Sequence, residues 1–489
     1  MGFDTSRTII PRQGTPYVSQ FLTFQRGVNN STSDEIIAQD ELADVRNFIP
    51  DSLNAGVLIS RPGSVQTYLQ TNPWTSIYQG RNNAYATTTS LIVGLQTNTT
   101  LATMTTSTAP DWTTYVGTDI FVNGVDAPQA TTDGSTFAAL AGSPPTFKYI
   151  ERQGQHLYGA GHENGRLRWA DTGTTTTWPA INELIITDDV ADDITGLARF
   201  NDLVVFCEKS FHRIRHGTSE ADISVAFSNY AAGCTSHRSI IVCPYGLFWW
   251  SQQGLAWTKD GMSFDLPLLR RIPKTLADLN KSKYSRVHGV YNADEGALQY
   301  FVCNDGSDTE NLSIWYYPPD ERFGRPESVW LMDGDGTEMG ASGFVVSNYT
   351  TSIYLGAAAS AGYMHLQTGT SDPIQASPGF GQPIICYLET KREVTDYGIK
   401  SQKKCTNIVL LLYSSGGDSI DYSTYVDNST TVDRTWTTPL TLAAGDNIAI
   451  EVPIGYERSY HKIKHRLYST AAGHTKVRGI VNSGHLVST

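Results

Sequence analysis

Two adjacent tryptophans constrain the fold of this chain more than any other feature. Trp249 and Trp250 end an apolar run within the stretch YGLFWWSQQGLAWTKDG, residues 245–261. The run is rich in β-branched and aromatic residues and is bounded by Gly and Pro, which predicts strands and not a helix. Neighbouring side chains of a strand point to opposite faces, so both indoles are buried only if both faces are covered. The pair therefore predicts sheets packed face to face.

The same stretch predicts a hairpin. Gln252, Gln253 and Gly254 form a polar turn, after which LAWT is expected to return antiparallel beside FWWS. A second turn is predicted at Asp260-Gly261, and a similar tight turn at Asn201-Asp202.

Composition extends this prediction to the whole chain. Only 17% of the 489 residues are charged, and Thr- and Tyr-rich phrases such as TTTSL and TGTTTTW alternate with Gly, Asn and Asp. Thr and Tyr favour strands, whereas Gly, Asn and Asp favour tight turns. Strand-like units recur with centres roughly 40 to 60 residues apart, close to the spacing of four-stranded propeller blades. We therefore expect an all-β chain with a β-propeller-like core over residues 61–370.

A short repeat supports this expectation. Residues 131–137 and 258–264 share the pattern T-x-D-G-x-[ST]-F. Asp bonds its own backbone in such a turn, Gly supplies a positive φ, and the aromatic ring packs under the next strand. The pattern is somewhat similar to the Asp-box turn of sialidase-type propellers, and we interpret it as structural.

Little helix is expected. Residues 33–48 have a Ser-Asp cap and loosely helical apolar spacing, and residues 272–284 have Pro273 near a first-turn position. Residues 1–60 are predicted to be an N-terminal arm with the first of these helices, which could reach neighbouring subunits.

The chain changes character near residue 371. A Pro/Gly linker precedes long alternating strands, which predict a C-terminal β-sandwich-like module over residues 371–489. Late strands that close the propeller are the alternative. Basic residues gather here, and we interpret them as a solvated or subunit-facing surface: Lys391, Arg392, Lys400, Lys403, Lys404, Lys462, Lys464 and Arg466.

Net charge limits the partners. The chain carries a formal charge of −12 and no block of Lys or Arg, which disfavours a protein that grips nucleic acid. A surface past which DNA slides remains compatible with this charge. The start lacks the pattern of a signal peptide, and the longest apolar run, residues 408–413, is too short to span a bilayer. No membrane insertion is expected.

Motifs that carry chemistry are scarce. The cysteines show no CxxC spacing, and Cys207, Cys243 and Cys303 lie in apolar runs, where burial is the simpler interpretation. His461 and His465 are expected to lie on a strand without a third ligand. The Asp-rich turns at 303–311 and 332–338 could hold calcium, although neither has the spacing of the helix-loop-helix calcium motif. We find no nucleophile elbow or phosphate loop and expect no enzyme: no catalytic, cofactor-binding or metal residue is nominated, and no cofactor.

Three distant segments carry a resemblance. The first contains Gly27-Val28-Asn29, an expected acidic helix from Asp34 to Val45, Asn47 and Arg61-Pro62-Gly63. The second is SIIVCPYGLFWWSQQGL, residues 239–255, and the third is YLETKREVTDYGIKSQKKCTNIVLLL, residues 387–412. Together and in this order they resemble tail hub or nozzle proteins of short-tailed bacteriophages.

The resemblance implies a structural virion protein at the tail tip, made in the bacterial host cytoplasm. It implies a homohexameric ring with a β-propeller in each subunit, below the portal and adaptor and in contact with tail fibres or a needle. Double-stranded DNA would leave through its channel without specific binding, which an acidic chain favours by repelling phosphate. Two alternatives remain: a β-propeller that binds or hydrolyses glycans, and a trimeric receptor-binding fibre or spike.

Overall fold

The computed structural model describes most of the chain. The residues outside the described part are 1–15, 22, 34–35, 53, 71, 106–109, 190–191, 217–221, 321–324, 334–338, 348–349, 359–362, 368–370, 375–376, 395–401, 415–418, 428–433, 436–439, 442–444, 453–461, 472–475 and 488–489. In the described part, nearly all regular structure is β, as predicted. The helices there are short: α1 (Pro267–Arg271), α2 (Pro273–Asp278), η2 (His237–Ser239) and η3 (Lys281–Arg286).

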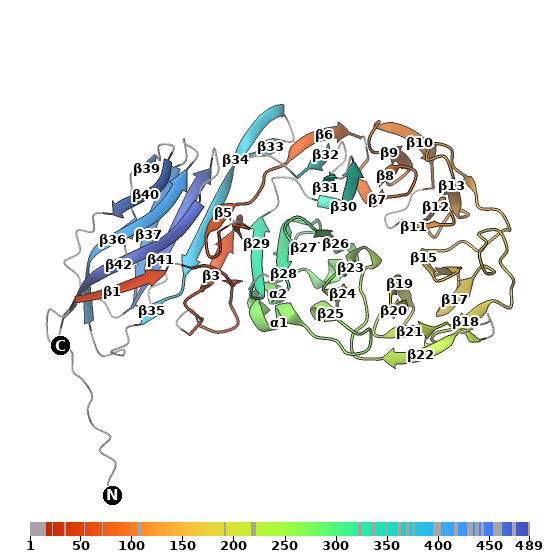
Figure 1. The fold of residues 1–489 in the computed structure, drawn as a ribbon, viewed down its shortest axis with the longest axis horizontal. Helices are drawn as coiled ribbons and strands as arrows, with labels where there is room; N and C mark the ends of the chain where they lie inside the picture. Colours follow the sequence, from red (N-terminus) through yellow and green to blue (C-terminus); the bar gives the residue numbers. More distant parts are fainter. Residues whose placement is uncertain are drawn as a thin grey trace, which may run out of the picture.

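Small antiparallel groups of strands follow one another around a common centre (Figure 1). Four are four-stranded sheets made of consecutive strands: β7 (Trp74–Gln79), β8 (Ala84–Thr88), β9 (Leu91–Gly94) and β10 (Thr99–Thr103); β11 (Asp111–Tyr115), β12 (Thr118–Val122), β13 (Gln129–Thr131) and β14 (Ala138–Ala139); β15 (Tyr149–Gln153), β16 (His156–Ala160), β17 (Arg166–Trp169) and β18 (Glu183–Ile185); β19 (Ile194–Phe200), β20 (Asp202–Cys207), β21 (Phe211–Arg215) and β22 (Ser224–Asn229).

Three further groups complete the arrangement. They are β23 (Ile241–Cys243), β24 (Gly246–Ser251) and β25 (Gly254–Thr258); β26 (His288–Asn292), β27 (Ala297–Val302), β28 (Leu312–Tyr317) and β29 (Ser328–Asp333); β30 (Met339–Ser347), β31 (Thr350–Ala357) and β32 (Tyr363–Leu366) with β6 (Val65–Leu69). The last group joins strands from distant parts of the chain, because β6 pairs antiparallel with β32. The strand before the first group is therefore the outer strand of the last. We call these seven groups of strands the ring of sheets.

The tryptophan hairpin forms as predicted. β24 pairs antiparallel with β25, with Trp249 opposite Ala256 and Trp250 opposite Leu255. Both tryptophans are fully buried, and each belongs to a different hydrophobic cluster. Both faces of β24 are thus covered, which confirms the packing that the adjacent indoles required. The predicted Asn201-Asp202 turn also forms, with Asn201 at φ 59° between β19 and β20.

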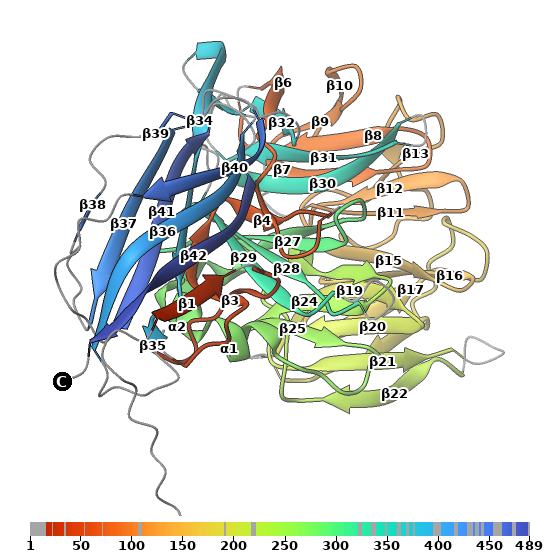
Figure 2. The same cartoon turned by 60° about the vertical axis from the view of Figure 1, so that its left-hand side comes forward.

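Long strands near the C-terminus pack beside this arrangement (Figure 2). One sheet has the order β4 (Phe48–Pro50), β5 (Leu58–Ser60), β42 (Lys476–Val487), β36 (Gln402–Ser414) and β40 (Gly445–Val452), and β1 (Pro16–Phe21) also pairs with β42. The other contains β33 (Ser371–Ile374), β34 (Ser377–Thr390), β35 (Glu393–Val394), β37 (Ser419–Val426), β38 (Arg434–Thr435), β39 (Leu440–Thr441) and β41 (Lys462–Ala471), which continue through β3 (Glu41–Arg46) and β2 (Gly27–Val28) to β29.

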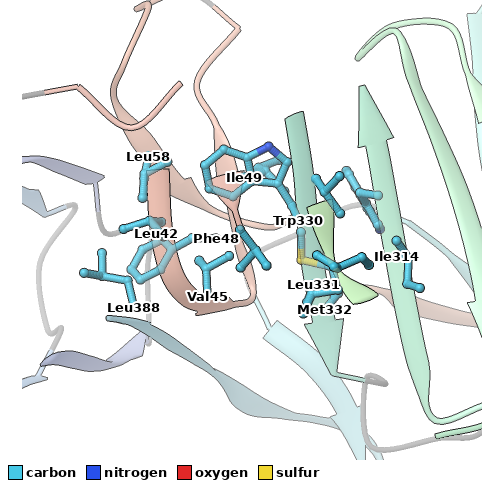
Figure 3. Close-up of a cluster of buried hydrophobic side chains, with 14 of the residues drawn as sticks. Leu42, Val45, Phe48, Ile49, Leu58, Ile314, Trp330, Leu331, Met332 and Leu388 are labelled. Atoms are coloured by element: carbon cyan, nitrogen blue, oxygen red, sulfur yellow. The ribbon is translucent and has the colours of Figure 1, made fainter. Parts of the chain in front are cut away.

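The helix expected over residues 33–48 does not form in the described part. Glu41–Arg46 is strand β3, which pairs parallel with β2 and antiparallel with β34. Its apolar side chains Leu42 and Val45 are fully buried (Figure 3). A sheet that supplies both backbone partners and a core overrides a weak local preference for helix. The second expected helix, over 272–284, is confirmed in part by α2 and η3.

The N-terminal strands join the two parts of the molecule. Phe48 and Ile49 lie in one cluster with Trp330 and Leu331 of the ring of sheets and Leu388 of the C-terminal strands (Figure 3). The division at residues 1–60, 61–370 and 371–489 stays a prediction, and these contacts tie the three ranges into one core.

Candidate functional site

The residues that carry the first segment of the resemblance have structural roles. Gly27 has φ 63°, and a Cβ there would lie 2.1 Å from the Val329 carbonyl oxygen. Asn47 also has a positive φ, and its side-chain oxygen accepts a hydrogen bond from Arg61 Nε at 2.9 Å. Only glycine fits at position 27 without a clash, so Gly27 allows β2 to lie directly beside β29.

A buried ion pair joins strand β3 to helix α1. Arg271 of α1 contacts Glu41 of β3, with Nη1 2.9 Å from Oε1. Asn29 donates to the other oxygen of Glu41 at 2.8 Å. Both charged groups are nearly inaccessible to solvent, so loss of either partner would leave a buried charge without its counterion.

The third segment is anchored in the same way. Glu389 accepts from Lys464 at 2.7 Å and from Arg466 Nε at 2.7 Å. The Arg466 guanidinium also lies over the rings of Tyr387 and Tyr425. Two of the basic residues expected on a solvated or subunit-facing surface therefore pair within the chain.

The repeated turns confirm their structural interpretation. Asp133 accepts hydrogen bonds from the backbone N–H groups of Ser135 and Thr136 at 2.8 Å. Asp260 accepts from Met262 and Ser263 at 2.8 and 2.9 Å. These donors stabilise the ionised carboxylates, lowering the pKa of Asp133 well below its usual range and that of Asp260 to about 2.

A cavity of about 430 Å³ lies among the inner strands of the ring of sheets. Its walls come from β7, β11, β23, β26 and β30 and the turn η2. Its polar lining includes Asp111, His237, Arg238 and His288. These residues are separated by up to 177 positions, so no local sequence signal predicted the site.

Arg238 crosslinks the wall of this central cavity. Its guanidinium donates to the carbonyl oxygens of Thr75 at 3.0 Å, Gly340 at 2.8 Å and Arg286 at 2.9 Å. Thr75 belongs to the first group of strands, and Gly340 belongs to the last. One side chain therefore fastens the two ends of the series of sheets.

Burial changes the titration of the other polar groups in the central cavity. It raises the pKa of Asp111 to about 7, although two backbone N–H groups, from Ile150 and Trp112, oppose the shift. Burial lowers the pKa of His237 to about 4 and that of His288 to about 3. The site therefore combines neutral imidazoles with a carboxyl group that titrates near neutral pH.

The other side chains that could carry chemistry are the cysteines and the Asp-rich turns. In the part of the chain that the structure describes, no three His, Cys, Asp or Glu residues gather as a metal site. Cys207 and Cys303 are buried, as interpreted from their apolar runs, whereas Cys243 is half-buried. In the 303–311 turn, Glu310 pairs with Arg286 at 3.0 Å, and residues 334–338 of the other Asp-rich turn lie outside the described residues.

Only one of the two histidines, His465, lies in the described part of the chain. His465 lies on β41 as expected, where it is buried and hydrogen-bonded to the Tyr422 hydroxyl. His461 lies outside the described residues. The described helices include none long and apolar enough to span a membrane.

Comparisons with known proteins assign no family. No family model and no curated protein matches the chain. Among solved structures, the computationally designed Ika8 protein is 11% identical with a TM-score of 0.38, covering 62% of this chain and 99% of its own. BamB from Moraxella catarrhalis is 11% identical with a TM-score of 0.37, covering 72% and 98%. A likeness this distant assigns no function.

Proposed function

We propose that this chain is a structural virion protein, the nozzle or hub of a short-tailed bacteriophage tail. It acts by assembly and not by catalysis. It forms a homohexameric ring at the tail tip, docks the adaptor and portal on one side, and holds tail fibres or a needle.

In this proposal the ring of small sheets is a seven-bladed β-propeller. The first strand of each group is the inner strand of a blade, and the pairing of β6 with β32 closes the circle. The Arg238 hydrogen bonds to Thr75 and Gly340 support closure, because they join the first blade to the last.

One observation carries the proposal. The three segments that resemble nozzle proteins are more than 100 residues apart in sequence, yet Leu42, Trp250 and Leu388 share one hydrophobic cluster. Gly27, Asn47 and Glu389 of the same segments make the contacts that hold this cluster's strands in place. A resemblance confined to chance phrases would not be expected to converge on one core.

Charge is consistent with a DNA conduit. The formal charge of −12 opposes adhesion of phosphate, so a genome would pass without specific binding. Strand β1, near the N-terminus, pairs with β42 at the side of its sheet, a position that suits a backbone contact with another subunit.

Mass photometry of the purified chain tests the assembly. The proposal predicts a species of six times the 53.6 kDa chain mass. A trimer contradicts the nozzle and supports the receptor-binding spike. A monomer at every concentration also counts against a ring that forms without other tail proteins.

A further inference from the structure

The C-terminal sheet that contains β40 has two unlike edges (Figure 1). Across this sheet the strands follow the order β1, β42, β36 and β40. Strand β1 runs along residues 480–485 of β42, whereas β5 reaches only residues 476–477. Among the residues that the structure describes, no strand pairs with the outer side of β1 or of β40. The sheet therefore ends in a free strand edge on either side.

Other strand edges of the molecule are shorter or covered. In the neighbouring sheet, β38 and β39 pair with the outer side of β37, along residues 423–424 and 419–420. In the ring of sheets, the outermost strand of each group has at most six residues, whereas β40 has eight. An unpaired edge is a template for pairing with another chain, and proteins usually shorten or cover such edges. A contact with another chain would explain why the edge of β40 is neither short nor covered.

The two free edges run in opposite directions. Strand β1 is antiparallel to β42, β42 is antiparallel to β36, and β36 is antiparallel to β40. A rotation about the axis of a ring keeps the direction of each strand along that axis. Where the strands run along the axis, β40 of one copy therefore meets β1 of the next copy antiparallel. The sheet can continue from copy to copy, as a head-to-tail contact between identical subunits requires.

Charge favours β1 over a second β40 as the partner of this edge. Strand β40 contains Asp446 and Glu451, whereas β1 has the sequence PYVSQF and no charged residue. Two β40 strands paired antiparallel over their full length would place Asp446 of each copy opposite Glu451 of the other. Like charges directly opposite each other destabilise a sheet, and pairing with β1 avoids them. A contact between two β40 strands would also be isologous and would give a two-fold dimer in place of a ring.

We propose that neighbouring subunits join by pairing β40 of one copy antiparallel with β1 of the next, so that this sheet runs continuously around the assembly. The inference rests on the proposed ring and names the surface that builds it. Each subunit offers one edge to each of its two neighbours, and the series closes when the rotation between copies closes.

Paired cysteines test this contact. Gln20 lies in register with Val409 through Val481, and Ala449 lies in register with Leu411, so both positions share one face of the sheet. Within one chain the two edges are three strand spacings apart, about 14 Å. A disulfide needs Cα atoms about 4.4–6.8 Å apart. A disulfide between the two edges therefore reports a contact between copies.

Three double variants sample successive registers of the pairing. Gln20→Cys is combined in turn with Asn447→Cys, Ala449→Cys or Glu451→Cys, which are alternate positions on one strand. After mild oxidation, one of the three pairs should give a ladder of covalent oligomers on a non-reducing gel, ending at the size of the full ring. When the two single variants of that pair are mixed before assembly, they should give covalent dimers only.

A matched control uses an edge that lies outside the proposed contact. Gln20→Cys with Thr100→Cys, at an exposed position of the outer strand β10, should crosslink no more than Gln20→Cys alone. The unaltered chain, with its six cysteines, sets the background. Thermal unfolding shows whether each variant folds.

Hydrogen exchange of the unaltered assembly adds a measurement that needs no substitution. Alternate backbone amides of β40 point away from β36 and would exchange fast at a free edge. In the assembly, these outward amides should exchange as slowly as the amides that are bonded to β36.

Three outcomes would overturn the inference. The first is an assembled ring in which no pair crosslinks or in which the outward amides of β40 exchange fast, and it leaves the nozzle proposal standing. The second is a covalent dimer from a cysteine in β40 alone, which would indicate contact between two β40 strands. The third is a chain that stays monomeric. A ladder that ends at a trimer would support the pairing and contradict the nozzle, so the two proposals fail separately.

Discussion

Trp249 and Trp250 are adjacent in the chain but occupy different hydrophobic cores. Trp249 contacts Phe206 and Phe211, at ring centroid distances of 5.1 and 5.4 Å. Trp250 contacts Tyr284 and Tyr300, at 5.8 and 5.7 Å. Strand β24 therefore divides one aromatic core from the other, as an inner element between two layers must.

This separation predicts additive effects of substitution. Trp249→Phe and Trp250→Phe should each lower the free energy of unfolding by about 1–3 kcal/mol, because each leaves a cavity in its own core. The double variant should match the summed losses within about 0.5 kcal/mol in urea unfolding. A coupling above about 1 kcal/mol would place both rings in one core.

Arg238→Met should destabilise the ring of sheets. The variant removes donors from the carbonyl oxygens of Thr75, Gly340 and Arg286, and buried acceptors without donors are costly. We expect a loss of about 2–4 kcal/mol in urea unfolding. Arg215→Met, at an exposed position of β21, is the control and should change stability by less than about 0.5 kcal/mol. Equal effects of the two would argue against the fastening role of Arg238.

Gly27→Ala should destabilise the chain by at least about 2 kcal/mol, because a left-handed backbone is combined with a direct clash against Val329. Gly154 offers a matched control, since it has φ 58° but no atom within 4 Å of the place where an alanine Cβ would lie. Gly154→Ala should therefore cost only about 1–2 kcal/mol, which is the strain of the backbone conformation alone. Thermal unfolding of both variants separates the clash from the backbone strain, and equal losses would contradict the close approach to Val329.

Asp111 predicts a pH dependence of stability. Its pKa in the folded chain, about 7, lies above that of an ordinary Asp, so the folded state binds the proton more tightly than the unfolded state. Its contribution is full below about pH 4 and is lost as the pH rises through about 7. His237 and His288 act in the opposite sense, because their folded pKa values of about 4 and 3 lie below the ordinary 6.5, so that their contribution to stability is gained as the pH rises towards about 6.5.

Asp111→Asn should consequently be more stable than the unaltered chain at pH 8, and its gain in thermal midpoint over the unaltered chain should grow along the pH profile from 5 to 8. Asp188→Asn, at an exposed site, should leave the profile unchanged. An unchanged profile in Asp111→Asn would mean that its carboxyl group titrates as an ordinary aspartate.

The sequence predicted the local features and missed the distant ones. The hairpin around Trp249, the Asn201-Asp202 turn and the Asp260 turn follow from residues within a few positions of each other. The pairing of β3 with β34 joins residues more than 300 positions apart, and no local pattern specifies it. The prediction of a helix over 33–48 was wrong for this reason, because Leu42 and Val45 fit a helical spacing but pack against other strands.

The central cavity was beyond sequence reasoning for a related cause. Asp111 of β11, Arg238 of η2 and His288 of β26 are far apart in the sequence but line the same cavity. Each residue alone is unremarkable in its local context. Only the arrangement of the sheets brings them together.

Electron microscopy of the assembled protein tests the central claim most directly. Class averages should show a sixfold ring with a central hole wide enough for duplex DNA, roughly 20 Å or more, given grooves about 12 and 6 Å wide. A threefold particle, or a sixfold ring whose hole is too narrow for the duplex, would contradict the account of this chain as a tail nozzle.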